Sequence, residues 1–534
     1  MSSPAEPSSS NASLAKSIAT DFFLAKNFDP KNLFAGISVI ICVLSLLCFV
    51  SLRSIAQDAE TRIGIFENHQ DIGKTSRHGS VQYDALKKTY TLRAGGDVSG
   101  PKADAFQFVW TQFSGDVAFS ADVAFADNCN SEHCKGVLML RQDLDSDSVF
   151  ASATLQANQV ASLQYRETKG SATHEIQSNA AASTRLRIEK RDGYAHVLLA
   201  ADGSEPGPSG AAIPVPQQGT FYLGIGVSSE DKVSVAKAVF SNVTVEAIGA
   251  KSTTPTTLYS ALQIIDIDTG DRSIVYVAPE HFEAPNWLRD GSSFLFNSDG
   301  HIYRLPVGGG KPVMIDTGFA NRCNNDHGIS PDSSLIAISD QSQEAHRSVI
   351  YTVPIGGGTP RRITQKSPSY WHGWSPDGST LVFVGERNGD FDIYAISEVG
   401  GQEKRLTTAK GLDDGPEYSP DGKYIYFNSV RTGLMQIWRM RPDGSEQTQI
   451  TDDDYNNWFP HISPDGKWMV ILSYDKGVQG HPQNKDVMLR LKPMSGGKIT
   501  VLARLFGGQG TINVPSWAPD SKQFAFVSYE LIPD

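Results

Sequence analysis

The second half of the chain alternates short apolar runs with turn-forming residues. The run Leu381–Val384 follows a Pro-Asp-Gly turn, in which Pro fixes φ and Gly accepts a positive φ. A second turn leads to the run Ile393–Ile396, and a Gly turn then leads to the closing segment Lys404–Thr407. Each such period predicts four short strands joined by three turns, which is one blade of a β-propeller.

The phrase Ser-Pro-Asp-Gly, or a degenerate form of it, marks each period. Counted from the serine or its equivalent, the copies begin at 288, 330, 375, 419, 463 and 518, at intervals of 42, 45, 44, 44 and 55 residues. A fixed period of this size indicates stacked structural units. The last copy has only two strands, so we predict that segments 262–270 and 273–277 complete it and that six blades form a ring closed by both ends.

The repeat resembles that of the TolB-type six-bladed propellers, which are bacterial extracytoplasmic proteins. The copies Trp374–Gly378, Tyr418–Gly422 and Ile462–Gly466 carry the resemblance, which extends over residues 258–534. It implies a binding or scaffold protein that recognises envelope partner proteins or polysaccharide. Because propellers serve as binding platforms and as enzymes, the fold alone does not decide between these functions.

Residues 63–248 lack the repeat but contain short alternating runs separated by Gly, Asp and Asn. This pattern predicts a two-sheet antiparallel β-sandwich, so the whole fold is expected to be all-β. The segments Asp104–Trp110 and Gly136–Arg141 resemble concanavalin A-like jelly-roll modules, which implies a carbohydrate-binding role. The polar segment 249–257 is expected to be the linker to the propeller.

The amino terminus predicts a membrane anchor. Residues 1–32 are rich in Ser, Ala and Asn and are expected to form a disordered cytoplasmic tail, whereas residues 33–52 are uncharged and long enough to span a bilayer. The flanking lysines favour a cytoplasmic amino terminus. We therefore expect a single-pass protein of the bacterial inner membrane with its bulk in the periplasm. A cleaved signal peptide is the alternative.

Composition narrows the classes of function. The net charge of −12 argues against nucleic acid as a partner. The chain has no G-x-S-x-G elbow and no H-E-x-x-H motif, and no hydrolase domain follows the propeller segment, which argues against a propeller-capped serine peptidase. In an oxidising compartment, Cys129 and Cys134 could close a small disulfide loop. A metal site at this pair with His133 is the alternative.

The sandwich offers candidate sugar-binding residues. Trp110 and Tyr165 could stack on a sugar ring, while Arg141 and Arg166 could bind its hydroxyl groups. The alternative is that the aromatic residues fill the core.

Polar residues also cluster just before the innermost predicted strand of each blade. Repeat symmetry places them around one mouth of the central channel, where they could bind a ligand or serve only to hold neighbouring loops together. The candidates are Asp326, His327, Trp371, His372, Asp413, Asp414, Glu417, Trp458, His461, Gln509 and Asn513. The long fifth period adds His481 and Lys485 in a loop between strands.

The three histidines of this set suggest a second function. His327 and His372 stand three residues before the turn serine and His461 stands two before, so they could hold a divalent metal. The oligogalacturonate lyases are similar propellers that perform metal-assisted elimination on uronates, chemistry that needs a cation and a base. Our first expectation is a binding protein without a cofactor. The alternative is a metal-dependent uronate lyase.

Overall fold

The computed structural model describes residues 62–533, except 76, 96–99, 127–128, 130–132, 181–182, 202–203, 216–218, 230–234, 250–254 and 346. The predicted cytoplasmic tail and membrane segment, at 1–32 and 33–52, lie outside the described residues. The described part of the chain is all-β, as expected, and among its residues no helix is long and apolar enough to cross a membrane.

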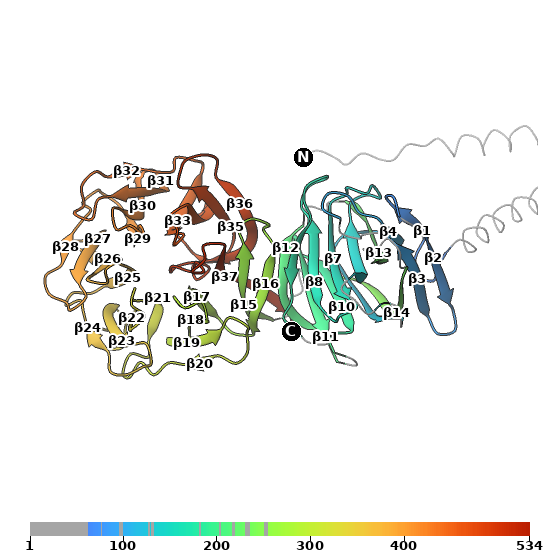
Figure 1. Ribbon diagram of the computed structural model, residues 1–534, viewed down its shortest axis with the longest axis horizontal. Coiled ribbons are helices and arrows are strands. Elements are labelled where there is room, and N and C mark those ends of the chain that lie inside the picture. The colour runs from blue at the N-terminus through green and yellow to red at the C-terminus, as the bar shows by residue number, and fades with distance from the viewer. Residues whose placement is uncertain are drawn as a thin grey trace, which may run out of the picture. The chain divides into compact units, whose positions relative to one another are not determined.

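Five four-stranded antiparallel sheets follow one another from Phe282 to Gly508 in a ring (Figure 1). Their strands are β17 Phe282–Trp287, β18 Ser293–Ser298, β19 His301–Pro306, β20 Val313–Met314; β21 Cys323–Ile329, β22 Leu335–Asp340, β23 Val349–Pro354, β24 Arg361–Arg362; β25 Ser369–Trp374, β26 Thr380–Arg387, β27 Asp390–Ser397, β28 Lys404–Arg405; β29 Asp413–Tyr418, β30 Ile425–Thr432, β31 Leu434–Met440, β32 Thr448–Gln449; and β33 Tyr455–Ile462, β34 Trp468–Asp475, β35 Gln483–Pro493, β36 Thr500–Gly508. Each sheet is one blade, so the predicted repeat unit is confirmed.

The predicted count of six blades, with the sixth shared by both ends, is wrong, because the described residues form five four-stranded blades. The two ends of the propeller segment do pair as expected: β15 (Thr256–Asp266) runs antiparallel to β37 (Gln523–Pro533), and β16 (Arg272–Ala278) pairs with β15. These three strands do not form a four-stranded sheet of their own. The position of an inner strand is reduced to one bridge between Trp517 and Phe524, and the outer edge of β16 pairs in parallel with β9 (His174–Gln177).

The residues before the propeller form two antiparallel sheets that pack face to face. One sheet comprises β1 Asn68–Ile72, β4 Phe106–Ser114, β13 Thr220–Ser229, β6 Cys134–Arg141, β7 Phe150–Gln156, β8 Ala161–Arg166 and β9, and it continues through β16 into β15 and β37. The other comprises β12 Gly207–Pro214, β11 Tyr194–Ala200, β10 Arg185–Arg191, β5 Val117–Phe125, β14 Ala236–Ala247, β3 Thr89–Gly95 and β2 Arg77–Asp84. The jelly-roll relationship of this sandwich stays a prediction.

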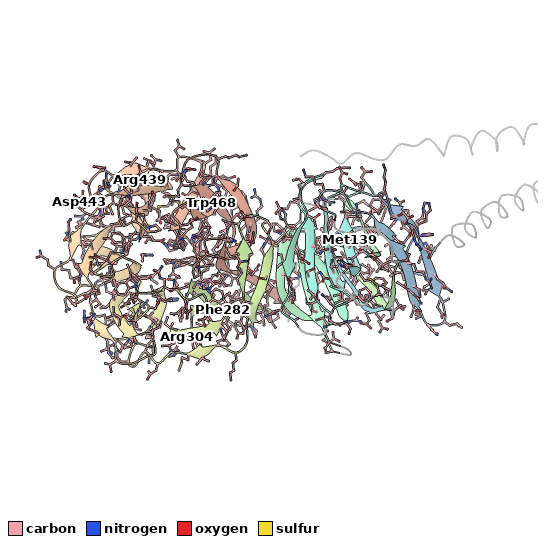
Figure 2. The ribbon with its side chains drawn as sticks, viewed as in Figure 1. Met139, Phe282, Arg304, Arg439, Asp443 and Trp468 are labelled. Atoms are coloured by element: carbon pink, nitrogen blue, oxygen red, sulfur yellow. A yellow bond between two sulfur atoms is a disulfide. The ribbon has the colours of Figure 1, made fainter. Side chains whose placement is uncertain are left out.

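Apolar side chains fill the sandwich and the spaces between blades. Met139 lies on a sandwich sheet and packs with Phe106 and Phe108, whereas Phe282 lies in the propeller and packs against Phe296 (Figure 2). Alternate residues of each strand point to opposite faces, so the short apolar runs of the repeat supply both faces of a blade. The disulfide between Cys129 and Cys134 is present in the sandwich.

A β-bulge in each inner strand sets which side chains face the channel. The pairing of each inner strand with the second strand of its blade shifts register after one residue: Glu283 in β17, Cys323 in β21, Trp371 in β25, Asp414 in β29 and Trp458 in β33. A bulge places an extra residue on one strand and turns the side chains beyond it to another direction. Counting residues back from the turn serine therefore does not fix where a side chain points.

Candidate functional site

A cavity of about 350 Å³ opens where the inner strands begin, and we call it the entry pocket. It is lined by Asn324, Asp326, Tyr370, His372, Val384, Phe391, Leu412, Asp414, Phe459, His481, Gln509 and Asn513. Five of these residues, Asp326, His372, Asp414, Gln509 and Asn513, belong to the predicted channel-mouth cluster. The structure thus brings together part of that cluster from several blades.

Two aspartates and one histidine form the charged centre of the entry pocket. His372 Nε2 lies 3.2 Å from Asp414 Oδ1, and both side chains are almost fully buried. Asp326 accepts a hydrogen bond of 2.7 Å from Asn324 Nδ2. Burial raises the pKa of Asp326 to about 6. The pocket therefore holds two carboxylates close to one imidazole.

The pKa values of His372 and Asp414 reflect the attraction between these two side chains. Burial opposes the charged form of His372, but the negative charges of Asp326 and Asp414 outweigh it and raise the pKa of the imidazole. Burial likewise opposes ionisation of Asp414, yet its hydrogen bond and attraction to His372 hold the pKa of this carboxyl below its usual range. At neutral pH, Asp414 is ionised and Asp326 is ionised in most molecules.

A third carboxylate lies behind the pocket. Glu283 Oε2 accepts a 3.3 Å hydrogen bond from Asn325 Nδ2, and burial together with the charge of Asp326 raises the pKa of Glu283 to about 7. The sequence did not single out Glu283, because the first repeat copy is degenerate. Glu283 stands five residues before Leu288, the serine equivalent of the first copy, and this spacing places it in inner strand β17. That spacing is the signal by which the sequence could have identified it.

The long loop of the fifth blade contributes His481. Its ring lies edge-on against Trp458, with 4.4 Å between centroids, and Nε2 is 3.7 Å from Asp414 Oδ2. Burial lowers the pKa of His481, and its Nδ1 has no hydrogen-bond partner among the described residues. The sequence showed His481 in this loop but did not predict that it lies beside the channel-mouth residues.

Phe459 occupies a strained backbone position in the wall of the entry pocket. Its φ is +51°, in the left-handed region that non-glycine residues rarely adopt, and Gly415 adopts +59° in the bulge of the preceding blade. The amide of Phe459 donates a 3.1 Å hydrogen bond to Asn428 Oδ1, which fixes this bulge. Strain of this kind is often found at functional sites.

The three predicted metal-binding histidines do not converge. His327 is fully buried, with Nδ1 3.1 Å from the carbonyl of Asn325, and burial lowers its pKa to about 4. His461 faces the Glu417 carboxylate with Nδ1 and the Ile512 carbonyl with Nε2, so protein oxygens already occupy the positions next to both ring nitrogens. Among the described residues, no group of three or more His, Cys, Asp or Glu side chains could hold a metal ion.

Other predicted channel residues lie in the protein interior. Asp413 accepts two hydrogen bonds from Arg431 Nη2, at 3.0 and 2.8 Å. The rings of Trp371 and Trp458 are almost fully buried and pack in the cores between blades, and neither lines the entry pocket.

The predicted sugar-binding residues of the sandwich are likewise engaged by the protein. Arg141 and Arg166 are fully buried and both pair with Asp104, at 3.2 and 2.8 Å. The hydroxyl of buried Tyr165 accepts a 2.8 Å hydrogen bond from Arg272. Trp110 is half-buried and packs edge-to-face on Tyr222. Both arginines are thus partners in buried ion pairs, and sugar binding on this face stays a prediction.

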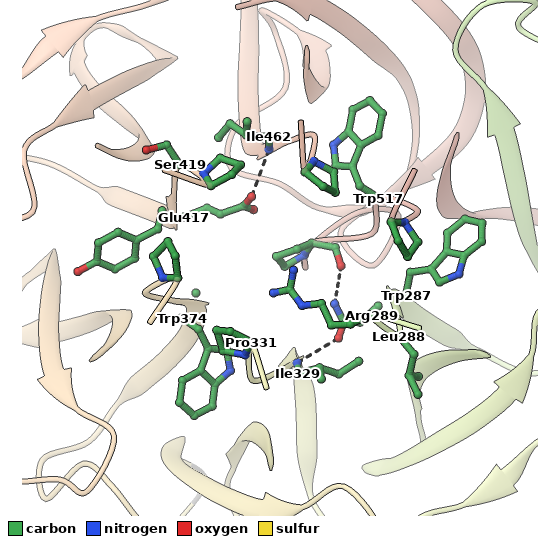
Figure 3. Close-up of a pocket in the computed structure, with 18 of the residues that line it drawn as sticks. Trp287, Leu288, Arg289, Ile329, Pro331, Trp374, Glu417, Ser419, Ile462 and Trp517 are labelled. Atoms are coloured by element: carbon green, nitrogen blue, oxygen red, sulfur yellow. Dashed lines mark hydrogen bonds between the residues drawn. The ribbon is translucent and has the colours of Figure 1, made fainter. Parts of the chain in front are cut away.

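A second cavity of about 350 Å³ lies where the inner strands end, and we call it the funnel (Figure 3). The turn phrases of the repeat line it. Its residues are Asn286, Trp287, Leu288, Arg289, Ile329, Pro331, Trp371, Gly373, Trp374, Pro376, Glu417, Tyr418, Ser419, Pro420, Ile462, Pro464, Pro515, Trp517 and Pro519. The sequence placed Glu417 in one cluster with His372, whereas the structure separates them between the two cavities.

The propeller is similar to a known protein family, to one bacterial protein and to a solved structure. A family model described as the TolB β-propeller domain matches residues 372–528. A protein of Agrobacterium fabrum, itself uncharacterised, is 53% identical over 271 residues, which make up 51% of this chain and 92% of that protein. A solved structure of a TolB candidate from Agrobacterium tumefaciens is 52% identical with a TM-score of 0.50, over 51% of this chain and 99% of that one.

A structure of oligogalacturonate lyase from Vibrio parahaemolyticus is also similar, but distantly. It is 15% identical over 51% of this chain and 78% of the lyase, with a TM-score of 0.33. A likeness at this level does not bear on activity.

Proposed function

This chain belongs to the TolB β-propeller family, and from this membership we propose that it is an extracytoplasmic binding protein whose entry pocket holds a partner protein of the cell envelope. The observation that supports the proposal is the convergence of Asp326, His372 and Asp414 in one cavity at the start of the inner strands. Rigid scaffolds commonly present such clusters to ligands.

The charge of the entry pocket favours a basic group from the partner. Asp326 and Asp414 supply two carboxylates against the single imidazole of His372, so an ammonium or guanidinium group would complete the charge balance. Tyr370 and Phe391 add half-buried aromatic rings to the wall, and aromatic faces attract cations. We therefore expect a lysine or arginine side chain of the partner in this pocket.

Envelope polysaccharide is the second class of ligand that we consider. Gln509 and Asn513 bring amide groups to the pocket, although Asn513 Oδ1 already accepts a 2.6 Å hydrogen bond from the amide of Gly510. The buried tryptophans leave little aromatic area for stacking on sugars. The metal-dependent lyase is not proposed, because His327, His372 and His461 lie apart.

The cellular location is part of the same proposal. The Cys129–Cys134 disulfide favours an oxidising compartment such as the periplasm. The uncharged segment 33–52 would anchor the chain in the inner membrane.

Binding of a capped trilysine peptide tests the pocket chemistry. We expect the purified protein to bind N-acetyl-trilysine amide, and the double variant Asp326→Asn/Asp414→Asn to bind it at least about tenfold more weakly, because even one lost charged hydrogen bond costs on the order of 1.5–3 kcal/mol. Calorimetry would measure both affinities. Asp443→Asn, in an exposed turn of another part of the propeller (Figure 2), is the matched control. Equal affinities for all three proteins would contradict the proposal.

A further inference from the structure

One repeat copy departs from the others at a position that faces the funnel. Five copies place a proline directly after the serine or its equivalent, and these prolines, Pro331, Pro376, Pro420, Pro464 and Pro519, all line the funnel. The first copy reads Trp287-Leu288-Arg289-Asp290-Gly291 and has Arg289 at the proline position. The ring of five prolines is therefore completed by an arginine.

Arg289 is the charged group of the funnel that has no partner. Arg289 and Glu417 are the only charged residues in the described lining of the funnel. Glu417 accepts hydrogen bonds from the amide of Ile462, at 3.2 Å, and from His461 Nδ1. Arg289 is exposed and makes no hydrogen bond or ion pair with any residue of the described chain. Figure 3 shows its side chain projecting into the middle of the cavity.

Several of the neighbouring polar side chains are already hydrogen-bonded within the protein. Asn286 donates through Nδ2 to the carbonyl of Pro515 and accepts through Oδ1 from the amide of Ile329. The indole nitrogens of Trp287, Trp374 and Trp517 donate to the carbonyls of Gly291, Gly328 and His461. The fourth lining tryptophan, Trp371, has a buried indole nitrogen with no hydrogen-bond partner among the described residues. The walls therefore present mainly apolar ring surface around the guanidinium of Arg289.

We propose that the funnel binds a polypeptide segment through a carboxylate, with Arg289 as the group that receives it. A guanidinium matches a carboxylate with two parallel hydrogen bonds. The proline and tryptophan walls suit the apolar side chain next to that carboxylate, and the cavity has room for one or two terminal residues.

The single cation favours a carboxylate over a phosphate. Glu417 is close enough to attract Arg289 electrostatically, so its negative charge opposes an incoming anion, and more strongly a dianion. Arg289 is open to the cavity, but the surrounding walls partly desolvate its guanidinium and lower its pKa, and an arginine remains charged at any physiological pH.

This site is separate from the entry pocket. The entry pocket lies at the starts of the inner strands and the funnel lies at their ends, so one propeller would hold an acidic group at one mouth and a basic group at the other. The inference does not depend on the proposed function of the entry pocket.

Tryptophan fluorescence provides the test, because Trp287, Trp374 and Trp517 line the funnel. The probes are N-acetyl-Ala-Leu-Phe with a free carboxylate, the same peptide with a terminal amide, and inorganic phosphate. We expect saturable binding of the free acid, and binding of the amide about tenfold weaker or more. In the Arg289→Ala variant, the affinity for the free acid should fall to that for the amide. In the Arg289→Lys variant, the acid should still bind more tightly than the amide, by a smaller factor than in the natural protein. Arg441→Ala, which removes a surface arginine paired with Glu446, is the control.

Equal binding of acid and amide, or an unchanged preference in Arg289→Ala, would overturn the proposal. The proposal would also be overturned if phosphate bound as tightly as the peptide acid and lost this binding in Arg289→Ala. The funnel would then be a phosphate site. The entry-pocket variant Asp326→Asn/Asp414→Asn should bind the acid normally, so failure at one mouth is distinguishable from failure at the other.

Discussion

The buried carboxylate of Asp326 makes the stability of the protein depend on pH. Its pKa rises from an ordinary 3.8 to about 6, mainly because of burial. The stability that this group contributes is therefore complete below pH 3.8 and is lost as the pH rises through 6. Asparagine has a similar shape and cannot ionise. We expect Asp326→Asn to be more stable than the natural protein by about 1–3 kcal/mol at pH 8, as measured by urea unfolding.

The same comparison at pH 4 should show little or no gain, because the aspartate is then mostly neutral. Asp454→Asn, at an exposed acid, serves as the control and should change little at either pH. A gain that is equal at pH 4 and pH 8 would show that ionisation of Asp326 is not its cause.

Glu417 is a structural residue in this account, although it lines the funnel. Its carboxylate satisfies the amide of Ile462 and His461 Nδ1, both of them buried. Glu417→Ala leaves these donors without a partner, and we expect a loss of about 1–3 kcal/mol in the free energy of unfolding. Glu446→Ala, which breaks an exposed pair with Arg441, should cost less than about 1 kcal/mol. Similar losses in the two variants would contradict the structural role of Glu417.

At the scale of the element, the repeat phrase is a turn held by its own side chains. Ser375 Oγ donates to Asp377 Oδ1, at 2.5 Å, and accepts from the amide of Thr380, at 3.0 Å. The hydrogen bonds from Ser375 and Ser379 hold the pKa of Asp377 below its usual range. The serine and aspartate of the phrase therefore close the turn between the first two strands of a blade.

Asp377→Ala should lower the free energy of unfolding by about 1 kcal/mol, because it removes the acceptor of these hydrogen bonds. Denaturant unfolding would measure the loss, and Asp454→Ala in an exposed loop should have no comparable effect. An Asp377→Ala protein as stable as the natural one would mean that Pro and Gly alone specify the turn.

The repeat predicted the strands well, because Pro-Asp-Gly turns and apolar runs act locally. It also predicted the pairing of β15 with β37, since the truncated last copy required strands from upstream. It did not predict the inner-strand bulges. His372 is the extra residue in the bulge of β25 and faces the entry pocket, whereas His327 lies beyond the bulge of β21 and is buried. The equal spacing of these two histidines from the turn serine therefore does not give them equivalent side-chain positions.

On the scale of the whole molecule, polar contacts join the sandwich to the propeller. His196 Nδ1 lies 2.8 Å from Glu530 Oε2, and Arg191 donates to the carbonyl of Leu531 at 2.7 Å. The relative from Agrobacterium fabrum aligns over 92% of its own length with 271 residues, or 51%, of this chain, so it has no counterpart to the other half. The propeller is therefore expected to fold without the sandwich.

We expect deletion of residues 63–245 to leave a propeller that unfolds cooperatively but at a lower temperature, because the interface strands lose their partners. Deletion of 258–278 instead removes the β16 strand and most of β15, including partners of β37, and should abolish cooperative unfolding. Calorimetry would compare the two. A cooperative transition after the second deletion would show that ring closure does not need β15.

Crosslinking in cells tests most directly the claim that the entry pocket holds an envelope protein. Phe391 lines this pocket and is half-buried, so a photoreactive benzoylphenylalanine at this position would contact a bound partner. We predict a defined adduct with an envelope protein that is lost in Asp326→Asn/Asp414→Asn and retained in Asp443→Asn. No protein adduct, or an adduct unaffected by loss of both aspartates, would contradict the account.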